Sequence, residues 1–198
     1  MTEGTPVAAV PRWVYLVTAL VVLVWAALVL NDMWALPAFA VLAWAWGAGV
    51  ATDLVRHDLP DRFTLLPYPL VLVALLLPAA AHGEWRRWLA ALVTGLVTAV
   101  VLFVIAFINP SGFGLGDVKL GLTTGTALGW VGGLTAGAVV HGLRMGLVGI
   151  FVAFALFAVV GVVLLVARRA GRTTDVAFGP FMVAGVLLAP AAAALLGW

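Results

Sequence analysis

Long apolar segments alternate with short polar turns along almost the whole chain. About seven such segments can be marked, each near the length that a helix needs to cross the hydrocarbon of a bilayer. They lie at about 13–30, 34–52, 63–81, 88–108, 118 onward, a sixth segment that ends near 167, and 177–196. The end of the fifth segment stays open between the Gly132–Gly133 pair and a turn at 141–144. Each segment is predicted to be a helix, because backbone polar groups in hydrocarbon must be satisfied internally.

Composition makes this an integral membrane protein. The chain has 198 residues, of which 65% are hydrophobic and 9% charged, with a mean hydropathy of +1.22. A soluble domain carries about 25% charged residues. The net charge of +2 gives no basic patch for nucleic acid, and the absence of cysteine excludes disulfides and thiol nucleophiles. The predicted fold class is an all-α polytopic bundle of about seven transmembrane helices.

Two aspartates lie at the ends of apolar segments. Asp53 follows the second segment, and Asp117 precedes the fifth in the stretch GFGLGD. Alternation of the segments across the bilayer places both carboxylates on the same membrane face. The three glycines of this stretch allow positive φ and close approach of another segment. The simpler reading of each aspartate is that it marks where a helix leaves the membrane, although burial of a carboxylate in a bilayer costs about 2.5–3.5 kcal/mol at the centre.

If these aspartates converge, they can form a pair that shares one proton. Such a pair can activate a water molecule for attack on a peptide carbonyl, with one carboxyl as base and the other as acid. The chain contains neither Gly-x-Ser-x-Gly nor His-Glu-x-x-His, which are signatures of other hydrolases. The composition therefore fits an aspartyl mechanism that needs no cofactor.

The distribution of Lys and Arg predicts the orientation. With a cytoplasmic amino terminus, the cations on the cytoplasmic side are Arg12, Arg56, Arg62, Lys119, Arg168, Arg169 and Arg172. Those on the outer side are Arg86, Arg87 and Arg144. Both aspartates then face the cytoplasm.

Three motifs resemble one protease family. The stretch GFGLGDVKL is similar to the Gly-x-Gly-Asp motif of membrane aspartyl proteases, and most of all to that of the prepilin peptidase (type IV leader peptidase) family. Asp53 precedes Leu59-Pro60-Asp61, as the first aspartate of that family precedes a similar tripeptide. Phe178-Gly179-Pro180-Phe181 resembles the segment that opens the family's last helix. The resemblance covers about residues 52–185.

The resemblance implies an aspartic endopeptidase of the bacterial cytoplasmic membrane, with Asp53 and Asp117 as the catalytic pair. Its substrates would be type IV prepilins or Flp-type precursors. The supporting residues that it implies are Gly114, Gly116, Lys119, Pro60, Asp61, Phe178, Gly179 and Pro180. Larger members also methylate the new amino terminus and carry a Cys-x-x-Cys domain. This chain has no cysteine, so methyl transfer is not expected.

The expected organisation is a tail and an uncleaved anchor helix at 1–33, followed by a peptidase core of six helices at 34–198.

The supporting residues also have simple structural roles. Pro60 suits the residue before a helix, and Asp61 is predicted to cap that helix. Lys119 either snorkels to the interface, holds Asp117 charged, or steers an acidic part of the substrate. Phe178, Gly179 and Pro180 fit the first turn of a helix. Glycines of the fifth and sixth segments lie at small-xxx-small spacing, which predicts helix packing.

Three alternatives remain open. Asp53, Asp58 and Asp61 could bind Mg²⁺, as in membrane enzymes that transfer phospholipid headgroups, although their Asp-Gly-x-x-Ala-Arg signature is missing. A presenilin-like protease shares Gly-x-Gly-Asp, but its Tyr-Asp and Pro-Ala-Leu motifs are absent. A small transporter could use the same carboxylates as a proton relay.

Overall fold

The computed structural model describes residues 12–108, 113–134, 137–167 and 176–197. Within these ranges the chain is all helical and forms no strand. The helices are α1 (Arg12–Leu30), α2 (Leu36–Arg56), α3 (Asp61–Thr64), α4 (Pro67–Ala74), α5 (Leu76–His82), α6 (Trp85–Ile108), α7 (Leu115–Gly132), α8 (Ala138–Val166) and α9 (Gly179–Leu195). The predicted all-α bundle is confirmed.

The third predicted segment is a broken helix made of α3, α4 and α5. Prolines explain the breaks, because each proline lacks an N–H and its ring collides with the carbonyl four residues earlier. Pro67 lies in the first turn of α4, and Pro78 lies in α5, four residues after the end of α4 at Ala74. Together, the three pieces still form an apolar stretch of 22 residues that is long enough to cross a membrane.

Five helical stretches have the length and hydropathy of membrane spans. They are α1, α2, the stretch from α3 to α5, α6 and α8. In α7 most residues from Leu120 to Gly132 are buried, because this helix lies among its neighbours and carries threonines and glycines. Since α7 ends at Gly132 and α8 begins at Ala138, the fifth segment stops at the glycine pair and not at residues 141–144.

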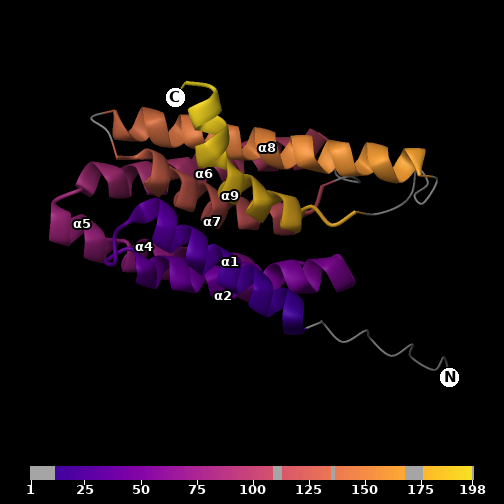
Figure 1. Ribbon diagram of the computed structural model, residues 1–198, viewed down its shortest axis with the longest axis horizontal. Helices are drawn as coiled ribbons and strands as arrows, with labels where there is room; N and C mark the ends of the chain where they lie inside the picture. Colours follow the sequence, from indigo (N-terminus) through magenta and orange to yellow (C-terminus); the bar gives the residue numbers. More distant parts are fainter. Residues whose placement is uncertain (1–11, 109–112, 135–136, 168–175, 198) are drawn as a thin grey trace.

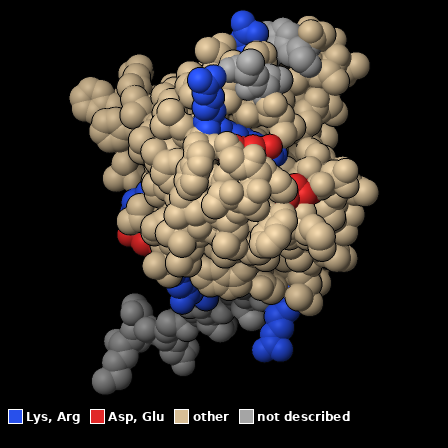
Figure 2. All heavy atoms as spheres, turned by 90° about the vertical axis from the view of Figure 1, so that its left-hand side faces the viewer, with Lys and Arg blue, Asp and Glu red and all other residues tan. Residues whose placement is uncertain are grey.

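The surface fits a bilayer. In Figure 2, which looks onto the end of the molecule that carries α5, uncharged side chains cover most of the area. Only 17% of the apolar window in each of α1 and α8 is buried inside the protein. The many exposed Leu, Val and Phe side chains therefore face lipid, and the chain is a multi-pass membrane protein.

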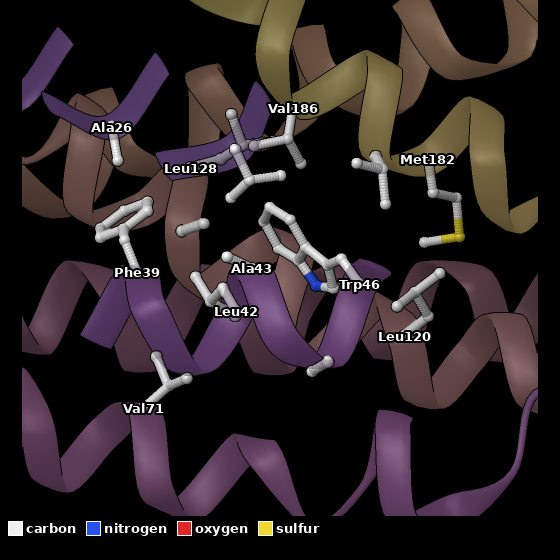
Figure 3. Close-up of a cluster of buried hydrophobic side chains, with 14 of the residues drawn as sticks. Ala26, Phe39, Leu42, Ala43, Trp46, Val71, Leu120, Leu128, Met182 and Val186 are labelled. Atoms are coloured by element: carbon white, nitrogen blue, oxygen red, sulfur yellow. The ribbon is translucent and has the colours of Figure 1, made fainter. Parts of the chain in front are cut away.

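The core joins the two halves of the chain. Figure 1 shows α1 to α5 along one side of the bundle and α6 to α9 along the other. Trp46 of α2 is fully buried between them, near Leu128 of α7 and Val186 of α9 (Figure 3). Its indole Nε1 donates a hydrogen bond of 3.0 Å to Thr123 Oγ1 of α7. This buried bond fixes the position of α2 against α7, although the two helices are far apart in sequence.

A buried arginine holds the carboxyl end of α7. Arg87 of α6 is 3% exposed, and its Nε donates to the Trp130 carbonyl at 2.8 Å while Nη1 pairs with Glu84. Its guanidinium also lies over the Trp130 ring, 4.2 Å from the centroid. The helix dipole favours a cation at this end of α7. The sequence indicated Arg87 only as a charge on the outer side.

The glycines of α7 let α6 approach closely, as predicted. A Cβ on Gly129 would lie 2.5 Å from the Ala90 carbonyl oxygen and 2.8 Å from the Ala91 Cα. A Cβ on Gly125 would lie 2.5 Å from Thr98 Oγ1 and 2.8 Å from the Thr94 carbonyl oxygen. The small-residue spacing therefore serves the packing of these two helices.

Replacing Gly129 with alanine is expected to lower the free energy of unfolding by about 1–3 kcal/mol, because α6 backbone atoms must move. The matched control is Gly161→Ala in α8, where a Cβ would meet nothing within 4 Å. Unfolding in mixed detergent micelles measures both variants. Equal stability of the two would contradict the close packing of α6 and α7.

Candidate active site

Asp53 lies at the start of α9, although it belongs to α2. The residue is 6% exposed, and its Oδ2 accepts a hydrogen bond of 2.9 Å from the Gly179 N–H. Gly179 is the first residue of α9. The first N–H groups of a helix lack partners within the helix, and its dipole favours negative charge there. Asp53 therefore supplies from a distant helix the acceptor that the amino terminus of α9 requires.

Asp117 plays the same part for its own helix. It lies in the first turn of α7, and its Oδ2 accepts from the Gly114 N–H at 3.3 Å. In return, the Asp117 N–H donates to the Gly114 carbonyl at 3.2 Å. This reciprocal pair is a form of the capping box. Both aspartates are thus held by backbone N–H groups at helix amino termini.

The helix ends that carry these aspartates meet at one end of the bundle, which we call the aspartate end. It lies opposite the end that carries α5 (Figure 1). α9 packs against both α2 and α7. Asp53 accepts from Gly179 of α9, and Gly116, the residue before Asp117, shares the neighbour Leu59 with Gly179, so the helix ends that carry the two aspartates adjoin the same side chain. The structure brings together the two residues that the sequence singled out.

Leu59 packs between Gly116 of α7 and Gly179 of α9. A Cβ on Gly116 would lie 2.8 Å from the Leu59 Cβ, and one on Gly179 would lie 3.5 Å from the Leu59 Cδ1. The side chain is 8% exposed. Sequence reasoning used Leu59 only as the first residue of the tripeptide Leu59-Pro60-Asp61. Its one signal was an apolar residue within the polar stretch from Asp53 to Arg62.

Gly116 therefore serves close approach, and neither Gly114 nor Gly116 has a positive φ. Gly114 has φ −84°, and the glycines with positive φ in the described ranges are Gly83 and Gly197. The expectation of positive φ near Asp117 is wrong for Gly114 and Gly116. Gly112, the first glycine of the motif, lies outside the described residues.

Lys119 forms an ion pair with Asp61 and not with Asp117. Asp61 lies in the first turn of α3, whereas the residue at the cap position is Pro60 and no side chain caps this helix. The predicted capping role of Asp61 is therefore wrong. The pair instead ties α3 to α7 at the aspartate end. Both side chains are partly exposed, so the pair stabilises the fold by about 1 kcal/mol or less.

A sharp turn after α2 brings this segment into place. His57 ends α2 in the left-handed region, with φ 49° and ψ 42°, and its N–H donates to the Asp53 carbonyl at 2.9 Å. The chain then reverses, so that Leu59 lies beneath Gly116 and Gly179.

Phenylalanine rings form one wall beside the site. The Phe178 ring lies 4.9 Å from Phe113, 4.9 Å from Phe154 and 5.4 Å from Phe157, measured between centroids. Phe113 precedes Gly114, and Phe178 precedes Gly179. The cluster therefore joins the loop before α7 to α8 and to the start of α9. Aromatic pairs of this kind contribute about 0.5–1.5 kcal/mol beyond the area they bury.

Comparisons of the chain with protein-family models, with curated proteins and with solved structures find no match. The three motifs of the prepilin peptidase resemblance nevertheless gather in space. Asp53, the tripeptide that starts at Leu59, the start of α7 and the start of α9 lie together at the aspartate end.

Substitution of Gly179 by alanine is expected to cost about 1–3 kcal/mol of stability, because the new Cβ would lie 2.7 Å from Asp53 Oδ2. The cost should fall when Asp53 is also replaced by alanine, which removes the colliding atom. A double-mutant cycle, read from unfolding in detergent, measures this coupling. Equal cost of Gly179→Ala in both backgrounds would show that the carboxylate does not lie against Gly179.

Proposed function

We propose that this protein is a membrane aspartic endopeptidase that removes leader peptides from type IV pilin-like precursors at the cytoplasmic face of the membrane. The single observation that carries the proposal is the meeting of Asp53 and Asp117 at one end of the bundle, each held at a helix amino terminus. A helix that merely leaves the membrane at an aspartate needs no second carboxylate beside it.

The proposed chemistry uses the two carboxyl groups as acid and base. The ionised carboxylate takes a proton from a water molecule as the water oxygen attacks the peptide carbonyl carbon. The protonated carboxyl gives its proton to the carbonyl oxygen, which yields a tetrahedral diol. The C–N bond then breaks, and a proton passes to the leaving amine. The products are a free carboxyl group and a free amino group, and water is the only other reactant.

The hydrogen bonds from Gly114 and Gly179 aim each carboxylate before substrate binds. Leu59 and the phenylalanine cluster restrict water around the pair. Such fixed dipoles need no reorganisation during the reaction, and this is a main source of catalysis in buried sites.

The cations support a cytoplasmic aspartate end. Among the described residues, Arg12 begins α1, Arg56 ends α2, Arg62 lies in α3 and Lys119 lies near the start of α7, and the ends of α1, α2 and α7 concerned lie at the aspartate end (Figure 1). Arg86 and Arg87 lie in the first turn of α6 and Arg144 near the start of α8, and these two helices begin at the opposite end (Figure 1). Arg168, Arg169 and Arg172 lie outside the described residues. Since pilin precursors carry their leader in the cytoplasm, the site would meet the scissile bond there. We propose peptidase activity without methyl transfer, because the chain has no cysteine.

Asp53→Asn and Asp117→Asn are each expected to lower leader removal by about 10²–10⁴-fold, because each removes one partner of the acid–base pair. The matched control is Asp58→Asn at the same end of the bundle. Asp58 is exposed in the turn after α2, so this variant should keep most of the activity. Coexpression with candidate prepilins, followed by separation of precursor and mature pilin on a gel, measures processing.

Two results would contradict the proposal. Full processing by either Asn variant would remove that residue from the pair. Loss of processing on addition of EDTA, together with loss in Asp58→Asn, would favour the magnesium alternative instead. Membrane insertion of each variant is checked by its yield after detergent extraction.

A further inference from the structure

A groove opens between α1, α2 and α3 at the aspartate end. Its volume is about 250 Å³, far more than one water molecule needs. The residues that line it are Arg12, Tyr15, Ala48, Ala51, Thr52, Arg62 and Phe63. The set contains two cations and no acid. Asp53, Asp117 and Gly179 do not line it, so the groove is separate from the candidate active site.

The two arginines come from different helices, Arg12 from α1 and Arg62 from α3. In the part of the chain that the structure describes, neither Arg12 nor Arg62 forms an ion pair. The acids nearest to the groove along the chain are already engaged. Asp61 pairs with Lys119, and Asp53 accepts from Gly179. The groove therefore offers two guanidinium groups that have no ion-pair partner among the described residues.

Aromatic packing holds one of these groups in place. The Arg62 guanidinium carbon lies 4.7 Å from the centroid of the Phe63 ring. Phe63 in turn packs edge-on against Trp44 of α2, with 5.7 Å between ring centroids. A cation held over an aromatic ring loses less freedom when it binds an anion. Arginine also presents a planar fork of N–H donors that matches the oxygens of a phosphate.

The depth of the groove points to the source of the anion. Arg12 begins the apolar span of α1, and the following Trp13 is 67% exposed. Tryptophan at the end of a span is typical of the level of lipid headgroups. The groove adjoins α1 through Arg12 and Tyr15, and only 17% of the apolar window of α1 is buried inside the protein. Phosphates of the surrounding bilayer therefore lie at the level of these two arginines.

We propose that this groove binds the phosphate of an anionic phospholipid, with Arg12 and Arg62 as its ligands and Tyr15 and Phe63 as its walls. Basic pockets between transmembrane helices bind anionic headgroups in this manner. Thr52 lines the groove and directly precedes Asp53, so the bound lipid supports the helix turn that presents the aspartate. The proposal holds whether or not the aspartates cleave peptides.

The test is native mass spectrometry of the full chain in detergent, titrated with dioleoylphosphatidylglycerol, with dioleoylphosphatidylcholine and with inorganic phosphate. We expect the phosphatidylglycerol complex to be the tightest. Arg12→Gln and Arg62→Gln should each weaken it about fivefold, because one cation near the membrane surface contributes about that factor. The matched control is Arg56→Gln, a cation at the same end that does not line the groove. This variant should bind as the unchanged protein does.

Phosphatidylglycerol affinity that stays the same in both groove variants would overturn the proposal. An equal loss in Arg56→Gln would overturn it too, because the binding would then reflect general charge. Displacement of the lipid by millimolar inorganic phosphate would assign the groove to free phosphate instead of lipid. If one of the two groove variants, Arg12→Gln or Arg62→Gln, fails to insert into the membrane, the lipid affinity of the other still decides the test.

Discussion

At the amino termini of both α7 and α9 a carboxylate accepts a hydrogen bond from a backbone N–H, and these two interactions organise the aspartate end. The first N–H groups of a helix have no partner within it and need an acceptor from elsewhere. In α7 the acceptor is the helix's own Asp117. In α9 the acceptor is Asp53, which lies 126 positions before Gly179 in the chain. For this bond to form, the end of α2 must reach the start of α9.

The contacts that complete this end are also the ones that would prepare a reaction. Leu59 fits because Gly116 lacks a side chain, Asp53 fits because Gly179 lacks one, and the Lys119–Asp61 pair holds α3 against α7. Trp46 sets the spacing of α2 and α7 deeper in the bundle through its bond to Thr123. Carboxylates fixed in this way need little reorganisation when charge develops on a substrate. The same interactions therefore stabilise the aspartate end and position the two carboxyl groups of the proposed acid–base pair.

Sequence periodicity predicted most of the fold, since apolar length alone marks helices in a membrane. It also predicted that Asp53 and Asp117 share a face, which follows from alternation of the spans. It could not predict the partner of Lys119, because a side chain at a helix start can reach several acids and the choice depends on where α3 lies. The position of α3 depends on the turn at His57, whose left-handed φ has no sequence signal. The role of Leu59 was hidden for the same reason.

The central claim is that Asp53 and Asp117 lie side by side, and the chain allows a direct test because it contains no cysteine. The double variant Asp53→Cys/Asp117→Cys, treated in membranes with a short bifunctional thiol reagent, should form an internal cross-link. The pair Asp53→Cys/Arg86→Cys, with thiols at opposite ends of the bundle, should form none. Absence of the cross-link in the first pair, while each cysteine alone reacts with a monofunctional reagent, would contradict the account.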